Sequence, residues 1–313
     1  MGARLERAFF SALARTATLG ADPRAPRLLA PLRDATWAFL SEALSAEEKS
    51  RLAVALYEVS TAYRDSPQHV WEQQWLEKRL PPPPARLLVG AAGAGREVLF
   101  LLGRGYEVLA LEPTPALAQA CRAQTRGAAE VIELRYEELA PEAAGATSDP
   151  GARESAGAAR DAGARKSAGA ASDAIAGERF DAVLLGLGSL SHLLDAGTRL
   201  AVLRALARMC PRGPILATAL TPPARPRPDS RASRIVRALA RPLRAARHLP
   251  PVDPGEIPFG GLGFVKLFTR GELVSMCATL ERTAAFDEGA PDGLALCSFE
   301  VTGGVAESAR DRS

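Results

Sequence analysis

The first place where this sequence could do chemistry is a glycine-rich turn, followed further along the chain by an isolated acid. The turn "GAAGAG" covers residues 90–95 after the apolar run "RLLV", and a second apolar run, "YEVLAL", leads to Glu112. Glycines between a buried strand and a helix let a ligand approach the backbone, and an acid after the next strand can accept hydrogen bonds from ribose hydroxyls. The pattern therefore predicts a bound nucleoside.

The spacing of the glycines disfavours other nucleotide sites. A dinucleotide fingerprint needs glycines at its first, third and sixth places, and this chain offers Gly90, Ala92 and Gly95. The Ala92 methyl group would obstruct a pyrophosphate, and no Gly-Lys-Ser/Thr follows the turn as a P-loop requires. An NAD(P)-dependent reductase is further disfavoured because the sequence contains no Tyr-x-x-x-Lys pair. Two simpler interpretations stay open: a tight turn without a ligand, and a helix-capping role for Glu112.

His192, in "GSLSHLLD", is the candidate catalytic residue. It is one of three histidines in the chain, and an imidazole titrates near neutral pH, so it can remove a proton from a substrate. The alternatives are a helix cap, a packed core residue, and a reaction that uses no base. Four aromatic residues at helical spacing fit either a core or a pocket wall: Tyr57, Tyr63, Trp71 and Trp75.

Alternating strands and helices must position these residues. From residue 87 onward, short apolar runs alternate with helical segments, which predicts an α/β fold with a doubly wound, mostly parallel sheet. The parallel strands are predicted within "RLLVG", "YEVLALE", "AEVIEL", "RFDAVLLGLG" and "PILATAL".

We predict a helical N-terminal cap over residues 1–84 and a main domain over 85–313. Ser45 and Glu48 form a capping-box pattern before a helix, and four prolines at 81–84 end the helical region. Residues 144–178 are a low-complexity insertion without large apolar side chains, which predicts disorder.

Residues 221–263 form a second insertion, rich in arginine and proline. A helix is predicted within it, with arginines on one side and Ile235, Val236, Leu239 and Leu243 on the other. Pro242 is expected to kink or end that helix. The arginine side is either a solvated surface or a site for an anionic partner.

Composition limits the remaining classes. The net charge of +3 creates no field that demands nucleic acid, and no apolar run is long enough to span a bilayer. The four cysteines lack CxxC spacing, which disfavours a zinc site and predicts small buried side chains. A short N-terminal apolar run, interrupted by Arg15, favours an amphipathic helix over a signal peptide. We expect a cytoplasmic protein.

Together these motifs resemble the class I S-adenosylmethionine-dependent methyltransferases, over about residues 87–299. "LLVGAAGAGRE" is similar to the first family motif, "VLALEP" to the second, "FDAVLLGLGSLSHLL" to the fourth-strand motif and "FVKLFTRGELVSMC" to the late "F-T-x-x-E-L" segment. The resemblance implies a Rossmann-like sheet with an antiparallel last strand, "LALCSFEV". It also implies S-adenosylmethionine as cofactor, bound by Gly90, Ala91, Gly93, Gly95, Glu112, Pro113, Tyr136, Gly186, Leu187 and Gly188.

Three positions depart from the family pattern. Val89 stands where the family commonly has an acid, which weakens recognition of the methionine amino group, and Ala91 stands where it has its first glycine. The acid that often pairs with adenine would fall near Arg135. The implied substitute is the Tyr136 backbone amide, with Glu137 or Glu138 nearby.

The sequence as a whole predicts a methyltransferase that acts on an O or N atom of a small molecule. The alternatives are an RNA or protein methyltransferase that uses the arginine-rich insertion, and a non-catalytic Rossmann-like binding or scaffold module. We expect neither a metal nor a nucleic-acid partner. The acceptor, the oligomeric state and the role of residues 221–263 are left open.

Overall fold

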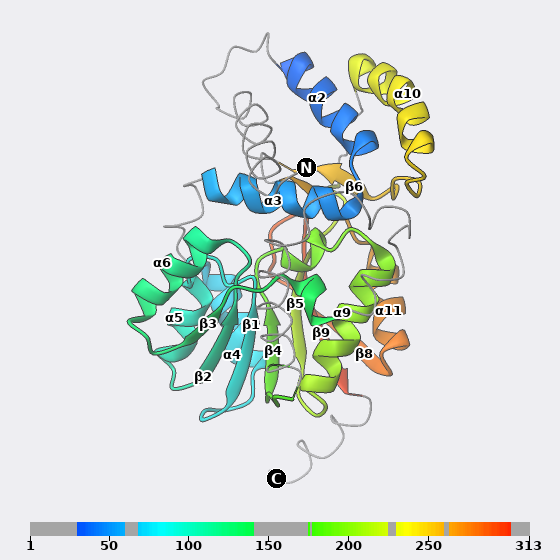
Figure 1. Ribbon diagram of the computed structural model, residues 1–313. Helices are drawn as coiled ribbons and strands as arrows, with labels where there is room; N and C mark the ends of the chain where they lie inside the picture. The colour runs from blue at the N-terminus through cyan, green and yellow to red at the C-terminus, as the bar shows by residue number, and fades with distance from the viewer. Residues whose placement is uncertain are drawn as a thin grey trace.

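The computed structural model describes residues 30–59, 68–140, 175, 177–224, 230–259 and 263–301. Its main sheet has the order β3-β2-β1-β4-β5-β9-β8 (Figure 1). The strands are β1 Arg86–Gly90, β2 Glu107–Leu111, β3 Glu130–Ile132, β4 Ala182–Leu185, β5 Ile215–Leu220, β8 Arg282–Asp287 and β9 Leu294–Val301. The neighbouring strands β3, β2, β1, β4 and β5 pair in parallel, whereas β9 runs antiparallel to both β5 and β8. The predicted fold class is confirmed.

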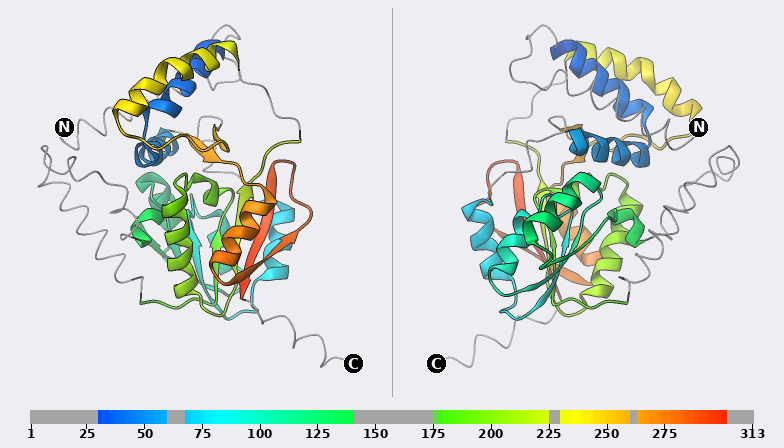
Figure 2. Two further views of the ribbon diagram at one scale, coloured as in Figure 1. Left: turned by 90° about the vertical axis from the view of Figure 1, so that its right-hand side faces the viewer. Right: turned by 60° about the vertical axis from the view of Figure 1, so that its left-hand side comes forward.

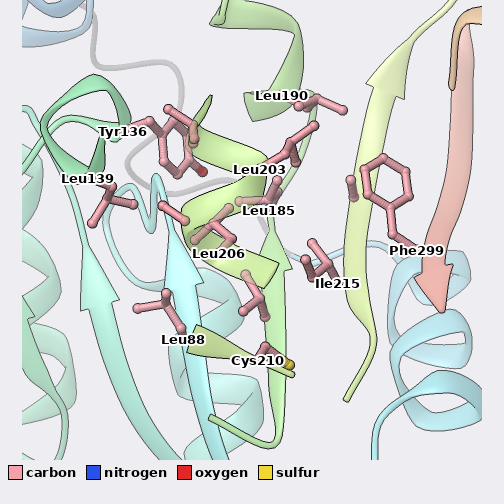
Figure 3. Close-up of a cluster of buried hydrophobic side chains, with 14 of the residues drawn as sticks. Leu88, Tyr136, Leu139, Leu185, Leu190, Leu203, Leu206, Cys210, Ile215 and Phe299 are labelled. Atoms are coloured by element: carbon pink, nitrogen blue, oxygen red, sulfur yellow. The ribbon is translucent and has the colours of Figure 1, made fainter. Parts of the chain in front are cut away.

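The central strands are apolar because both of their faces are covered. In β1, Leu87 faces one core cluster and Leu88 the other, and both side chains are fully buried. Helices α4 Val70–Arg79, α5 Arg96–Leu102 and α6 Pro115–Thr125 pack on the Leu87 face. Helices α9 Ala196–Met209 and α11 Arg270–Thr279 pack on the Leu88 face, which Figure 3 shows at close range. This two-sided cover is what defines a doubly wound sheet.

A cap of helices and a short hairpin lies beyond the carboxyl ends of the parallel strands (Figures 1 and 2). It contains α2 Ala30–Ala43, α3 Ala46–Val59, α10 Arg231–Ala246, and the antiparallel pair β6 Glu256–Pro258 and β7 Phe264–Lys266. A buried ion pair joins α3 to β6, with Lys49 Nζ 2.5 Å from Glu256 Oε1. Trp37 of α2 packs edge-on against Phe264 of β7. The cap is therefore assembled from two parts of the chain that are distant in sequence.

Two local predictions are confirmed, namely the capping box and the burial of the cysteines. The Ser45 hydroxyl accepts from the Glu48 amide, and the Glu48 carboxylate accepts from the Ser45 amide, so the capping box starts α3 as expected. All four cysteines are buried and free of disulfides. No helix among the described residues is long and apolar enough to cross a membrane.

Other predictions need correction. Of the two outcomes expected at Pro242, an end of the helix is wrong, because α10 continues through it to Ala246, and a kink stays a prediction. The low-complexity insertion was predicted to lack large apolar side chains and to be disordered, but it contains Ile175 near its end, which is 1% exposed and belongs to the sheet core. Most of that insertion lies outside the described residues. The boundary at residue 84 stays a prediction, although α4, on its cap side, contributes Trp75 and Leu76 to the core beside β1.

Candidate functional site

A cavity of about 600 Å³ opens at the carboxyl ends of β1, β2 and β4, under the cap. The order of strands reverses between β1 and β4, and such a switch point is where open α/β sheets bind ligands. The turn after β1, the end of β2, the short helix η2 (Tyr136–Leu139) and the loop after β4 line the floor. Helix α3 closes the cavity from the cap side with Ser50, Ala53, Val54 and Tyr57.

The glycine turn has a conformation that glycine favours at three points. Ala91, Gly93 and Gly95 have φ angles of 48°, 57° and 95°. Ala91 thus has a left-handed backbone although it carries a methyl group. A Cβ added at Gly93 would meet no atom within 4 Å, whereas one at Gly95 would lie 2.8 Å from Cys121 Sγ. Gly93 therefore leaves space in the cavity, and Gly95 permits α5 and α6 to pack closely.

Glu112 holds the turn in place from the end of β2. It is 3% exposed, its Oε2 accepts from the Gly93 amide at 2.8 Å, and its Oε1 accepts from the Thr114 amide at 2.8 Å. Burial raises the pKa of this carboxyl above its ordinary value, and the two backbone hydrogen bonds oppose that rise. Because each carboxylate oxygen can accept a further hydrogen bond, Glu112 can still receive donors from a ligand.

The predicted cofactor residues divide into two groups. Those that line the cavity are Ala91, Gly93, Glu112, Pro113, Tyr136, Leu187 and Gly188. Gly90, Gly95 and Gly186 lie behind this surface and shape it. Gly90, for example, cannot carry a side chain, because a Cβ there would lie 2.4 Å from Tyr136 Cε1.

Tyr136 lines the cavity as expected, but its side chain makes contacts that the sequence did not indicate. Its ring covers Gly90, and its buried hydroxyl donates to Ser189 Oγ at 3.0 Å, across the switch point. Burial raises the pKa of this phenol well above its ordinary value, so it stays protonated and donating. The side chain thus ties η2 to the loop after β4.

His192 meets Tyr57 in the wall between the sheet and the cap. It ends the short helix η4 (Ser189–His192) after β4, and its Nε2 lies 3.2 Å from the Tyr57 hydroxyl of α3. Desolvation lowers the pKa of His192 to about 4, against a smaller opposing effect of a hydrogen bond with the Phe264 backbone. The imidazole is therefore neutral at physiological pH, whereas a histidine with its ordinary pKa of 6.5 would be partly protonated there.

A pair of buried acids beside the cavity was missed by the sequence reasoning. Glu72 of α4 and Glu97 of α5 are 1% and 6% exposed, and the Arg96 guanidinium lies within ion-pair distance of both carboxyl groups. Burial, and then the charge of Glu97, raise the pKa of Glu72 to about 8. Arg96 and Glu97 line the cavity near the glycine turn. No sequence signal joins these acids, because they meet only when α4 packs against α5.

The Glu72 carboxyl should make the protein less stable as the pH rises. In the unfolded chain Glu72 loses its proton above its ordinary pKa of 4.5, whereas the folded protein retains it up to about 8. Folding then requires proton uptake in this range, so stability falls as pH increases from about 5 to about 8. We expect calorimetry to give a higher melting temperature for Glu72→Gln than for the wild type, and the difference should grow as the pH rises from about 5 to about 8.

Glu77→Gln is the matched control for this measurement, because Glu77 lies on the exposed side of the same helix and pairs with Arg104. A Glu72→Gln margin independent of pH would show that Glu72 is ionised in the folded protein.

Comparisons with known proteins find similarity to this chain in its three-dimensional structure and not in its sequence. No protein-family model and no curated protein matches the sequence. Among solved structures, the chain is similar to an amino pentose methyltransferase from Micromonospora echinaspora, with 16% identity, a TM-score of 0.45, and coverage of 74% of this chain and 92% of that one.

It is also similar to a glycopeptide N-methyltransferase, with 17% identity, a TM-score of 0.46, and coverage of 76% and 92% of the two chains. Magnesium protoporphyrin IX methyltransferase from Synechocystis matches with 10% identity and a TM-score of 0.45, over 80% of this chain and 97% of that chain. The strand order, with its antiparallel β9, independently gives this chain the Rossmann-like architecture that the sequence motifs implied for class I methyltransferases.

Proposed function

We propose that this protein is an S-adenosylmethionine-dependent methyltransferase that modifies an O or N atom of a small molecule. The observation that carries the proposal is the position of Glu112, which lies at the end of β2, bonds the Gly93 turn, and faces the cavity at the switch point. A buried carboxylate at this point, beside a turn that leaves space, suits a ribose and its amino-acid tail better than a pyrophosphate.

The residues present fit this cofactor. Glu112 would accept from the ribose hydroxyls, and the open space over Gly93 would hold the methionine portion. Arg135 to Glu137, in and before η2, border the side where an adenine would lie. S-adenosylmethionine, when bound, supplies an electrophilic methyl group on a sulfonium.

The chain's own part in the reaction would be alignment, exclusion of water, and removal of one proton. The cavity wall includes the apolar side chains of Val54, Leu193, Ile257, Phe259 and Leu267. A wall of this kind excludes water from the reacting atoms and favours an acceptor with an apolar body. His192 Nε2 would take the proton that the attacking O or N atom loses, because the imidazole is neutral. The Tyr57 hydroxyl, 3.2 Å from Nε2, would hold the imidazole in place until the acceptor displaces it from that nitrogen.

A cavity of this size also supports a small acceptor rather than a macromolecule. Its volume of about 600 Å³ must hold both the cofactor and the acceptor, and small-molecule sites commonly enclose about 300–1,000 Å³. An RNA or protein acceptor would need an open groove leading away from the switch point.

A thermal-shift comparison tests the proposed class. A ligand that binds only the folded protein raises its melting temperature in proportion to RT ln(1 + [L]/Kd). We expect S-adenosylmethionine and S-adenosylhomocysteine to raise the melting temperature, and NADPH to leave it unchanged. A shift with NADPH alone would contradict the proposal. If S-adenosylmethionine binds, transfer of labelled methyl groups to a panel of small acceptors would identify the substrate.

Replacing Glu112 with alanine should weaken binding of S-adenosylhomocysteine by about 1.5–3 kcal/mol, or about 10- to 150-fold in Kd. The physical reason is the loss of charge-assisted hydrogen bonds to two ribose hydroxyls. Calorimetric titration measures the change, and circular dichroism checks the fold, because the Gly93 and Thr114 amides also lose their acceptor. An unchanged affinity in a folded variant would remove Glu112 from the ligand site and leave it only its role in holding the turn.

A further inference from the structure

Helix α10 packs into the cap through the face that its sequence does not mark as apolar. Its buried residues are Ser233, Ala240 and Arg244. These lie against α2, the helix beside which α10 runs in every view (Figures 1 and 2). The Arg244 guanidinium replaces an apolar contact there and donates to the backbone carbonyls of Ser41, Glu42 and Pro250.

As a consequence, the apolar side chains of Ile235, Leu239 and Leu243 on α10 point away from the protein. Ile235, Leu239 and Leu243 follow one another at intervals of four and therefore share a face, and they are 60%, 75% and 41% exposed. They are three of the nine large hydrophobic side chains that are exposed among the described residues. Helix α2 adds Leu32 and Phe39, which are 66% and 44% exposed. We call Ile235, Leu239 and Leu243 the apolar row.

The charges beside this row are of one sign. Helix α10 contains arginines at 231, 234, 237, 241 and 244 and no acidic residue. Arg231, Arg234 and Arg241 are exposed and lie to one side of the apolar row, since the helical repeat of 100° per residue separates the two sets. An exposed apolar row flanked by arginines on a helix of large amphipathicity is the pattern of helices that lie in the interface of a membrane.

We propose that α10 docks this protein on the surface of membranes that contain anionic lipids. The apolar row would enter the boundary between head groups and acyl chains. The exposed arginines would remain at the level of the lipid phosphates, where their long side chains reach the charged groups. The inference does not depend on the proposed methyl transfer, because α10 contributes no residue to the cavity wall.

Charge favours this occupant over a second copy of the chain. A two-fold dimer through the apolar row would bring the same surface of each copy together, and so would oppose two sets of exposed arginines with no acid on either helix. An anionic bilayer instead complements those arginines while it covers the apolar side chains.

Co-sedimentation with vesicles tests the proposal on the full chain. We expect the protein to pellet with phosphatidylcholine vesicles that contain about one-third phosphatidylglycerol, and to pellet at least about 10-fold less with phosphatidylcholine alone. The double variant Ile235→Ser, Leu239→Ser and the triple variant Arg231→Gln, Arg234→Gln, Arg241→Gln should each lose most of this binding. Both variants should keep wild-type circular dichroism and cofactor affinity, since the altered side chains are exposed and lie outside the cavity.

Val274→Ser is the matched control, because Val274 is 47% exposed on α11, in the main domain. Its binding to vesicles should equal that of the wild type. Binding by the double variant at the wild-type level would overturn the proposal. A wild type that does not pellet with anionic vesicles would overturn it as well. If light scattering then shows that the wild type is a dimer and that the double variant is a monomer, the occupant of the apolar row is a second copy.

Discussion

Replacing His192 with alanine should lower kcat by about 10²- to 10⁴-fold, while the affinity for S-adenosylhomocysteine changes little. The imidazole adjoins the cavity beside Tyr57, away from Glu112 and the glycine turn, so its loss removes a proton acceptor and leaves the cofactor contacts in place. Single-turnover rates and calorimetric titration of the same preparation separate the two effects. Asparagine should not rescue the rate, because its amide accepts a hydrogen bond but cannot take a proton.

The pH dependence gives an independent readout of the same residue. Since desolvation lowers the pKa of His192 to about 4, the wild-type rate should begin to fall only as the pH approaches that value. The neutral imidazole also links folding to pH. The unfolded chain binds a proton at about 6.5 and the folded protein does not, so the stability that depends on neutral His192 is lost as the pH falls from about 6.5 to about 4.

A variant with reduced stability and an unchanged kcat per folded molecule would contradict the catalytic role of His192. The reaction would then depend on alignment and desolvation alone. Tyr57→Phe separates positioning from proton transfer, because it keeps the ring that packs edge-on against His192 and removes only the hydroxyl. We expect a smaller loss in kcat for Tyr57→Phe than for His192→Ala.

Replacing Gly93 with valine should abolish measurable binding of S-adenosylmethionine, an effect of more than about 100-fold in Kd. The new side chain would project into space that no protein atom occupies within 4 Å of its Cβ, and this is where the methionine portion of the cofactor would lie. The variant should also lose about 1–2 kcal/mol of stability, because Gly93 has a φ of 57° that a side chain disfavours. Thermal melting with and without ligand measures both quantities.

Gly127→Val is the matched control for the backbone effect. Gly127 has a φ of 77° and open space around its Cβ position, but it follows α6 and does not line the cavity. It should lose a similar amount of stability and bind the cofactor like the wild type. Retention of binding by folded Gly93→Val would contradict the position proposed for the methionine portion.

The local pattern of the sequence was enough to predict the five parallel strands and the glycine turn between them, whereas β9 was expected only from the family resemblance and β8 was not predicted. A buried strand, a glycine turn and a helix are adjacent in the chain, so their apolar runs and glycines report their structure directly. Glu112 could be placed in the same way, because parallel neighbours such as β1 and β2 end at the same edge of the sheet. The capping box at Ser45 is equally local.

Only the tertiary structure decided which distant side chains meet and which helix face is buried. Tyr57 reaches His192, and Glu72 reaches Arg96, through helix packing that no spacing in the sequence encodes. The amphipathic pattern of α10 revealed two unlike faces, but it did not show that the cap would bury the face of Ser233, Ala240 and Arg244. Periodicity measures the contrast between two faces of a helix, whereas burial depends on the shape and hydrogen-bonding groups of the surface that receives it.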